Sequence, residues 1–143
     1  MIQVQTHSIK ELSRFVQDQI SSLAVSGQIL LLNGEMGSGK TEFVKQLVQL
    51  LGGDIASSPS FAIQNTYLTP KIRIEHLDLY RLESEDELQS VGFWDLFENT
   101  ESLIIIEWAN KIDIKRLPLN WKKKNLSFKI VSENVRSLCL RGF

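Results

Sequence analysis

The sequence predicts an α/β fold with a mixed sheet of parallel and antiparallel strands flanked by helices. A glycine-rich segment, residues 34–41, lies between a continuous apolar run at 29–32 and an amphipathic run at 43–51, which is the order strand, loop and helix. A second apolar run at 103–106 is typical of a strand covered on both faces. Alternating patterns at 126–130 and 136–141 predict an antiparallel hairpin at the end of the chain.

The composition is that of an ordinary globular protein. The chain has 143 residues, of which 43% are hydrophobic and 23% are charged, which suits one domain spanning residues 1–143. The formal net charge of −1 excludes a protein that binds nucleic acid through a generally basic surface. We see no bilayer-length apolar run and no signal-peptide pattern, so we expect a cytoplasmic protein with no membrane partner. The lone Cys139 is expected to be a half-buried strand thiol.

The first 27 residues predict a short strand followed by a helix. Apolar and polar residues alternate over 2–5, as in a strand with one buried face. Ser8 and Glu11 form the capping-box pattern that begins a helix, and Gly27 follows its expected end. The helical spacing is carried by Ile9, Leu12, Val16, Ile20 and Leu23.

Residues 34–41 match the phosphate-binding P-loop pattern G-x-x-x-x-G-K-[ST], so the expected fold is P-loop NTPase-like. The loop lies between a strand at 29–33 and a helix at 39–51. Its glycines let successive N–H groups point at an anion, and the helix adds its dipole. We expect Lys40 to reach the β- and γ-phosphates and Thr41 to bind Mg²⁺. The predicted phosphate-binding residues are Gly34, Glu35, Met36, Gly37, Ser38, Gly39, Lys40 and Thr41.

The middle of the chain predicts a hairpin and a short helix. A Pro-containing loop at 57–60 leads into alternating segments at 61–68 and 72–77, whose spacing fits two strands joined by a turn. Ser84 and Glu87 form another capping-box pattern. Core or partner-facing roles are expected for Phe93, Trp94, Leu96 and Phe97.

Nucleotide hydrolysis needs an acid besides the P-loop, and two acids are suitably placed. Glu107 follows the run at 103–106, where a Walker-B acid belongs, because ligands of α/β sheets gather beyond the carboxyl ends of strands. Asp78 ends the second hairpin strand and suits orienting water or holding a Mg²⁺-bound water. An N-cap or a salt bridge to Arg81 is the alternative for Asp78. His76 is interpreted as a core histidine, with a metal or acid/base role as the alternative.

Five motifs follow one another in order between residues 27 and 108. They are the P-loop, Ser58-Pro59-Ser60-Phe61, His76-x-Asp78-x-Tyr80-Arg81-Leu82, Gly92, and Ile106-Glu107-Trp108. In this order they resemble the TsaE (YjeE) family, the ATPases of bacterial tRNA threonylcarbamoyladenosine synthesis.

The resemblance implies a weak ATPase that uses ATP and Mg²⁺ and acts on the proteins TsaB and TsaD. In that system TsaD transfers threonylcarbamoyl to adenosine 37 of tRNA, so this chain could meet tRNA indirectly through the complex. The resemblance implies catalytic roles for Lys40, Asp78 and Glu107, and Mg²⁺ ligation by Thr41 and Glu107. The segment 58–61 would be a nucleotide-sensing switch. Further nucleotide contacts are implied for Glu42, Ser60, Trp108 and Arg136.

The chain departs from the family pattern at three places. Ser60 replaces the usual Thr but keeps its hydroxyl. Glu42 stands where a second Thr is usual, and its charge is favoured by the helix dipole although it lies near the expected phosphates. Ser13 is a loose match for a nucleotide-proximal Thr of the N-terminal helix. Arg81 is the internal candidate for an arginine finger, with a structural salt bridge as the alternative.

Two other functions use the same motifs. One is a nucleotide-dependent binding module whose hydrolysis is incidental, and the other is a small-molecule kinase. A basic stretch could touch tRNA or an acidic partner, or be a solvated face. It comprises Lys111, Lys115, Arg116, Lys122, Lys123 and Lys124.

Overall fold

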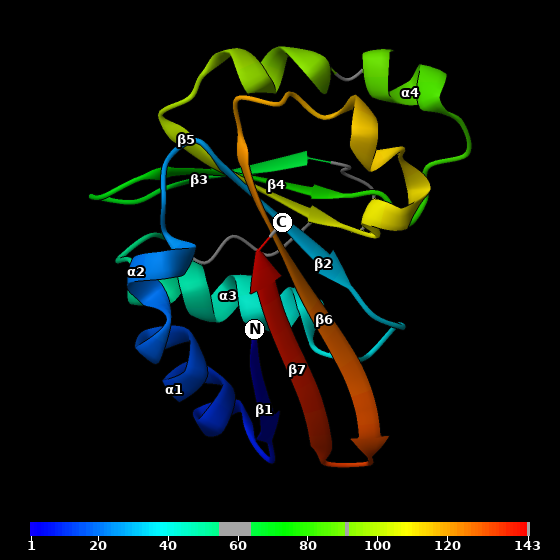
Figure 1. The fold of residues 1–143 in the computed structure, drawn as a ribbon. Coiled ribbons are helices and arrows are strands. Elements are labelled where there is room, and N and C mark those ends of the chain that lie inside the picture. Colours follow the sequence, from blue (N-terminus) through cyan, green and yellow to red (C-terminus); the bar gives the residue numbers. More distant parts are fainter. Residues whose placement is uncertain (55–63, 91, 143) are drawn as a thin grey trace.

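The computed structural model describes residues 1–54, 64–90 and 92–142, and their strands form one mixed sheet flanked by helices (Figure 1). This arrangement confirms the predicted α/β fold. The strand order across the sheet is β1-β7-β6-β2-β5-β4-β3. The strands are β1 (Ile2–Thr6), β2 (Gln28–Asn33), β3 (Gln64–Leu68), β4 (Arg73–Asp78), β5 (Ser102–Glu107), β6 (Lys122–Ser132) and β7 (Val135–Gly142).

Four parallel strands form the centre of the sheet, and antiparallel strands extend it on both sides. β2 runs parallel to β5 and to β6, and β4 runs parallel to β5. β3, β7 and β1 each pair antiparallel with a neighbour. Glu107 lies opposite Leu32 on one side and opposite Asp78 on the other. The carboxyl ends of β2, β5 and β4 therefore meet at one edge of the sheet.

Helices cover both faces of the sheet (Figure 1). Along β2, Leu30 and Leu32 point into one apolar cluster, and Ile29 and Leu31 point into the other. This alternation is what a strand buried on both faces requires. One face is covered by α1 (Ile9–Asp18), α2 (Ile20–Leu23) and α3 (Lys40–Leu50), and the other by α4 (Glu85–Ser90) and the 3₁₀ turns Trp94–Glu98, Ala109–Lys111 and Ile114–Arg116.

The N-terminal helix begins as predicted but ends early. The Ser8 hydroxyl caps it by accepting from the Glu11 N–H at 3.2 Å. The expected continuous helix to Leu23 is wrong, because the chain leaves helical geometry at Gln19, with φ −103° and ψ 7°. The Gln28 side chain on β2 donates to two carbonyls of the second segment, at 3.0 and 3.1 Å. A tertiary contact with the sheet therefore holds α2 as a separate turn.

The predicted hairpins are present. β3 and β4 pair antiparallel over the described part, while 57–60 and 61–63 lie outside the described residues. The C-terminal hairpin is also present, although β6 begins at Lys122 rather than at 126. The aromatic residues after α4 belong to the core: Phe93 and Phe97 are buried, and Trp94 and Leu96 pack against their cluster.

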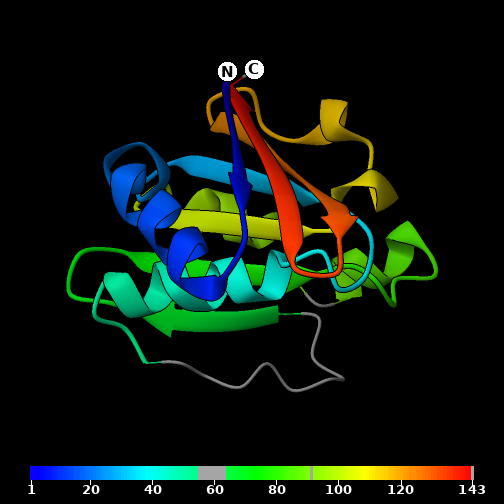
Figure 2. The same ribbon diagram turned by 90° about the horizontal axis from the view of Figure 1, so that it is seen from below.

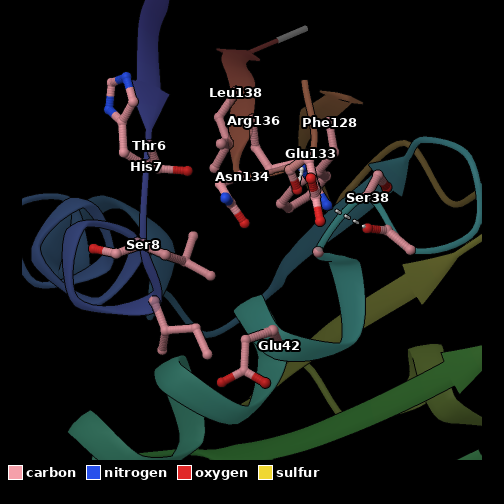
Figure 3. A pocket seen from close by; sticks show the side chains of 14 residues that line it. Thr6, His7, Ser8, Ser38, Glu42, Phe128, Glu133, Asn134, Arg136 and Leu138 are labelled. Carbon is pink, nitrogen blue, oxygen red and sulfur yellow. Dashed lines mark hydrogen bonds between the residues drawn. The ribbon is translucent and has the colours of Figure 1, made fainter. Parts of the chain in front are cut away.

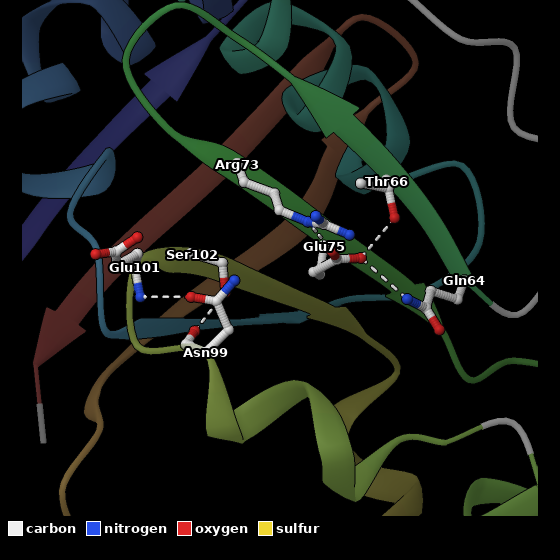
Figure 4. A network of polar contacts seen from close by, with 7 residues as sticks. All are labelled: Gln64, Thr66, Arg73, Glu75, Asn99, Glu101 and Ser102. Carbon is white, nitrogen blue, oxygen red and sulfur yellow. Dashed lines mark hydrogen bonds and ion pairs between the residues drawn. The ribbon is translucent and has the colours of Figure 1, made fainter.

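Glu75 is a buried carboxylate that serves the sheet (Figure 4). Its side chain lies on β4 and the residue is 2% exposed. Gln64 Nε2 and Thr66 Oγ1 donate to its Oε2 at 2.9 and 2.7 Å, and Arg73 Nε donates to its Oε1 at 2.6 Å. All three donors come from β3 or β4, so this charge is neutralised by its own hairpin.

The first and last strands of the chain lie side by side (Figure 2). β1 pairs with β7 over five residues, with Thr6 opposite Arg136. The start of α1 is thereby brought next to the turn between β6 and β7. Among the described residues, no helix is both long enough and apolar enough to cross a bilayer.

Candidate functional site

The P-loop connects the end of β2 to the first residue of α3. A Cβ atom on Gly34 would lie 2.6 Å from Ser38 Oγ and 2.7 Å from the Phe128 carbonyl oxygen, so only glycine fits there. Gly39 has φ 111°, a value that L side chains rarely adopt. The buried Ser38 hydroxyl has no hydrogen-bond partner within the described part of the chain. An unpaired polar atom inside a glycine-lined cradle is the expected state of a loop that binds a polar ligand.

The Lys40 ammonium group is folded back into the loop. The residue is 5% exposed, and Nζ donates to the Gly34 carbonyl and, at 3.5 Å, to the Glu35 carbonyl. Nζ also lies 3.7 Å from the centroid of the Trp108 ring. Burial lowers the pKa of Lys40, while the nearby carboxylates of Glu107 and Asp78 act in the opposite direction. The loop thus holds a cation that has lost much of its hydration.

The two predicted metal ligands lie together. Thr41 Oγ1 donates to Glu107 Oε1 at 3.4 Å. Glu107 is 2% exposed, and its backbone carbonyl accepts from the Leu79 N–H at 3.1 Å. A hydroxyl and a carboxylate at this separation can both face one small cation.

His76 lies behind Glu107, away from the loop. His76 Nε2 is 2.5 Å from Glu107 Oε2, and the Tyr67 hydroxyl is 3.4 Å from His76 Nδ1. Burial raises the pKa of Tyr67, and the Glu107 charge raises it further. His76 is 2% exposed, so it is a hydrogen-bonded core histidine, as the sequence pattern indicated.

Asp78 lies beside Glu107 at the end of β4. The two residues are register partners across β4 and β5. Asp78 Oδ1 accepts from the Tyr80 N–H at 3.0 Å, which is a local turn bond. Arg81 is exposed, and no ion pair within the described residues joins it to Asp78. The second carboxylate oxygen of Asp78 is therefore available to the site.

Trp108 has an unusual backbone conformation. Its φ of 60° and ψ of 43° lie in the left-handed region, and no other non-glycine residue of the described chain has positive φ. The Trp108 ring also packs on Tyr80, with ring centroids 5.0 Å apart. Conformations of this kind cost free energy and are concentrated at functional sites.

A cavity of about 470 Å³ lies in front of the P-loop and is lined by loop residues and by residues at the ends of β4 and β5. Its lining includes the two predicted acids, Asp78 and Glu107, and also Lys40 and Thr41. Mg²⁺ is usually held by one or two carboxylates with phosphate oxygens and waters, so the pair Thr41 and Glu107 fits this ion. Within the described residues, no group of three or more His, Cys, Asp or Glu side chains forms a metal site supplied by protein alone. The cavity is lined by Met36, Gly37, Ser38, Gly39, Lys40, Thr41, Glu42, Lys45, Asp78, Tyr80, Glu107 and Trp108.

A second cavity, of about 340 Å³, lies on the other side of the P-loop (Figure 3). The two cavities share Gly37, Ser38, Gly39 and Glu42. Arg136 spans from the C-terminal hairpin to the loop, where its Nη2 donates to the Gly37 carbonyl at 3.3 Å. Sequence reasoning missed most of this cavity, because the pairing of β1 with β7 leaves no local signal. The lining residues it missed are Thr6, His7, Ser8, Ile9, Leu12, Phe128, Glu133, Asn134 and Leu138.

Of the three residues at which the chain departs from the family pattern, only Glu42 lies at the described P-loop cavities. Ser13 lies in a separate groove with Arg14 and Gln46, and it lines neither cavity at the P-loop. Glu42 lines both cavities, and its carboxylate accepts from Gln46 Nε2 at 2.9 Å. Ser60 lies outside the described residues.

The basic stretch is largely used inside the chain. Lys111 donates to the carbonyls of Tyr80 and Leu82, at 2.9 and 3.2 Å. Lys124 donates to the Ser22 carbonyl at 2.8 Å. These bonds favour a structural role over tRNA contact for this segment. The same is true of Arg116, which pairs with Glu85, and of Lys123, which donates to the carbonyls of Pro118 and Trp121.

Comparisons with known proteins agree on one family. The profile described as "Threonylcarbamoyl adenosine biosynthesis protein TsaE" matches residues 6–138. A protein of Borreliella burgdorferi named tRNA threonylcarbamoyladenosine biosynthesis protein TsaE is 39% identical over 105 residues, which is 73% of this chain and 75% of that protein. The protein of the same name from Haemophilus influenzae is 33% identical over 119 residues, which is 72% of this chain and 74% of that protein. The protein of the same name from Rickettsia prowazekii is 38% identical over 86 residues, which is 59% of this chain and 58% of that protein.

A solved structure has the same fold. The crystal structure of Bacillus subtilis YdiB superposes with a TM-score of 0.69 over 96% of this chain and 82% of that one. The sequence identity is 24%, so this likeness concerns the fold.

Proposed function

The chain belongs to the TsaE family, and on that premise we propose that it binds ATP with Mg²⁺ and hydrolyses it slowly in support of threonylcarbamoyladenosine formation in tRNA. The observation that carries the proposal is the 3.4 Å contact between the Thr41 hydroxyl and the Glu107 carboxylate at the mouth of the P-loop.

The phosphates would occupy the cavity in front of the loop. There the N–H groups of the loop and the start of α3 favour negative charge. Lys40 would exchange its bonds to the Gly34 and Glu35 carbonyls for bonds to the β- and γ-phosphates, since it is already buried at that position. Its positive charge would stabilise the charge that develops on the β–γ bridging oxygen as that bond breaks.

Thr41 and Glu107 would hold Mg²⁺. When bound, this ion neutralises phosphate charge and orients the γ-phosphoryl group. Glu107 is buried, so its carboxylate has few competing waters and keeps its position. Thr41 supplies a neutral oxygen from the first turn of α3, where its hydroxyl already faces Glu107.

Asp78 would orient the attacking water. Its Oδ1 is engaged by the Tyr80 N–H, which fixes the carboxylate, and its other oxygen can accept from water. The water oxygen forms the new bond to the γ-phosphorus while the bond from phosphorus to the β–γ bridging oxygen breaks. The electron pair stays on that oxygen, one water proton remains on the product phosphate and the other passes to solvent, giving ADP and phosphate. Arg81, the internal candidate for an arginine finger, is exposed and does not line the cavity in front of the loop, so it is not in place to stabilise charge on the transferred phosphoryl group. Slow turnover of the isolated chain is the expected consequence.

The nucleoside part would lie in the second cavity. The P-loop tip is common to both cavities, so a nucleotide with its phosphates in one can extend into the other. Apolar walls from Leu12, Phe128 and Leu138 suit a base, and Arg136 lies at the boundary between the two spaces. Trp108 is on the phosphate side, where it covers Lys40.

In this proposal the partners are TsaB and TsaD, and ATP binding and hydrolysis load or reset their complex. The test is a pull-down of both proteins with this chain in ATP, in ADP and without nucleotide, together with phosphate release by the isolated chain and by the mixture. We expect retention to depend on the nucleotide and phosphate release to rise in the mixture. Equal retention of TsaB and TsaD in ATP, in ADP and without nucleotide would contradict the switching role.

A binding module with incidental turnover is the second candidate. Its supporting observation is that Lys40 Nζ bonds to the P-loop carbonyls of Gly34 and Glu35, so the loop and Lys40 would bind the phosphates without help from Asp78. Modification of tRNA that persists in a variant that binds but does not hydrolyse ATP would favour this module. Multiple-turnover phosphorylation of a metabolite would instead favour a small-molecule kinase.

A further inference from the structure

We infer that His76, held from behind by Tyr67, is a positioning residue that aims the Glu107 carboxylate at Mg²⁺. The inference rests on the proposed function, because it assigns a role toward the same ion. It concerns residues on the buried side of Glu107, which contribute no side chain to either cavity at the P-loop.

The hydrogen-bond directions follow from the chemistry of the three groups. An ionised carboxylate only accepts, so His76 Nε2 carries a proton and donates it to Glu107 Oε2 across 2.5 Å. In the neutral ring Nδ1 is then an acceptor, and the Tyr67 hydroxyl donates to it across 3.4 Å. The carboxylate thus sets the ring tautomer, and the Tyr67 hydroxyl is placed to donate to the nitrogen that this tautomer leaves unprotonated.

The two carboxylate oxygens of Glu107 therefore have different partners. Oε2 is occupied by His76, whereas Oε1 faces the Thr41 hydroxyl. A Glu side chain has three rotatable bonds, and fixing one oxygen from behind removes most of its freedom. Both residues are 2% exposed, so water does not compete for this bond. Metal ligands are commonly oriented in this way by a buried partner.

Glu75 shows what a purely structural carboxylate looks like in the same sheet. It is equally buried, but side chains of its own hairpin donate to both of its oxygens. Glu107 has one side-chain donor behind it and a hydroxyl in front, and that hydroxyl is itself a candidate ligand. Of these two carboxylates, Glu107 lines the cavity in front of the P-loop and Glu75 does not.

The test compares two substitutions of nearly equal shape. His76→Gln keeps an N–H donor near the Nε2 position, and His76→Met removes it. ADP binding is measured by calorimetry in EDTA and over a Mg²⁺ titration, so hydrolysis is not the readout. Thermal unfolding in EDTA checks that each variant is folded, and Tyr67→Phe removes only the hydroxyl behind the ring.

We expect His76→Met to raise the Mg²⁺ concentration for half-maximal ADP binding by about 10- to 100-fold. Its ADP affinity in EDTA should stay within about twofold of the unsubstituted chain, because the phosphate cradle is untouched. His76→Gln should restore most of the Mg²⁺ response, and Tyr67→Phe should give a smaller shift than His76→Met.

Three results would overturn the inference. The first is a Mg²⁺ response in His76→Met equal to that of the unsubstituted chain. The second is an equal loss in His76→Met and His76→Gln, which would make the ring a packing element. The third is a parallel loss of ADP affinity in EDTA. Failure of the proposed function itself looks different, since the unsubstituted chain would then show no Mg²⁺-dependent ADP binding at all.

Discussion

Thr41 Oγ1 and Glu107 Oε1 lie 3.4 Å apart although 66 residues separate them in the chain. The contact exists because β2 and β5 are parallel neighbours, so the loop that follows β2 and the acid that ends β5 reach the same edge. Asp78 arrives there through the pairing of β4 with β5. The sheet register therefore brings the candidate acids together, and each can be tested separately.

Replacing Glu107 by Gln should abolish the Mg²⁺ dependence of nucleotide binding and lower ATP turnover by about 100-fold or more. The amide keeps the shape of the side chain but loses the charge that a divalent cation requires. Phosphate release and nucleotide affinity with and without Mg²⁺ are the measurements. Glu75→Gln is the matched variant, since that carboxylate is equally buried on β4. It should lose stability but keep its Mg²⁺ response; loss of the Mg²⁺ response in both would contradict the assignment.

Substituting Asp78 separates its turn bond from its chemistry. Asp78→Asn keeps an oxygen that accepts from the Tyr80 N–H, whereas Asp78→Ala does not. We expect both variants to lose about 100-fold in turnover while ADP affinity is retained. Only the Ala variant should also lose about 1 kcal/mol in the free energy of unfolding. Full activity of Asp78→Asn, measured by steady-state phosphate release, would show that Asp78 is a structural turn residue.

Lys40→Met should lower nucleotide affinity by about 100-fold or more, because a buried cation is removed from the phosphate position. Calorimetric titration with ADP is the measurement. Lys129 is exposed on β6 and provides the comparison, since Lys129→Met removes one charge whose side chain does not line either cavity at the P-loop. Equal affinity of the Lys40 and Lys129 variants would exclude the P-loop lysine from phosphate binding.

The lowered pKa of Lys40 has a consequence for stability at alkaline pH. Burial favours the neutral amine, so in the folded chain Lys40 loses its proton at lower pH than in the unfolded chain. Between its folded pKa and the ordinary value near 10.5, the unfolded chain binds more protons, and the contribution of Lys40 to the free energy of unfolding rises with pH. Urea denaturation of nucleotide-free protein at several pH values between 8 and 10 is the measurement. The free energy of unfolding of the unsubstituted chain should rise with pH relative to that of Lys40→Met. A difference that is constant with pH would exclude the shift.

Local patterns predicted the parts of the fold whose signals are local. The P-loop, the strand before it and the helix after it are defined by glycines, an apolar run and a 3.6-residue period. The run ending at Ile106 predicted β5, and with it the placement of Glu107. The hairpin of β3 and β4 followed from its spacing, which also placed Asp78.

Other features depend on pairings that leave no local mark. The parallel contact of β6 with β2 and the pairing of β1 with β7 join distant segments. Those pairings form the second cavity, so most of its lining was not predicted. His76 was interpreted as a core histidine, with a metal or acid/base role as the alternative, and its contact with Glu107 was not predicted because it depends on the register of β4 against β5. The carbonyls of Ser22 and Leu23 in α2 likewise accept hydrogen bonds from a side chain of β2, a contact that no local pattern signals.

The indole of Trp108 gives the chain a built-in optical reporter. Its ring centroid lies 3.7 Å from Lys40 Nζ, the cation that would move on phosphate binding in the proposed mechanism, and indole emission responds to nearby charge and water. Trp121 is buried, with its Nε1 bonded to the Phe97 carbonyl, and Trp94 packs in the same apolar cluster. Neither of these two lines the cavity in front of the loop. If the proposed binding is right, intrinsic fluorescence would follow nucleotide entry in real time, without a label attached to protein or nucleotide.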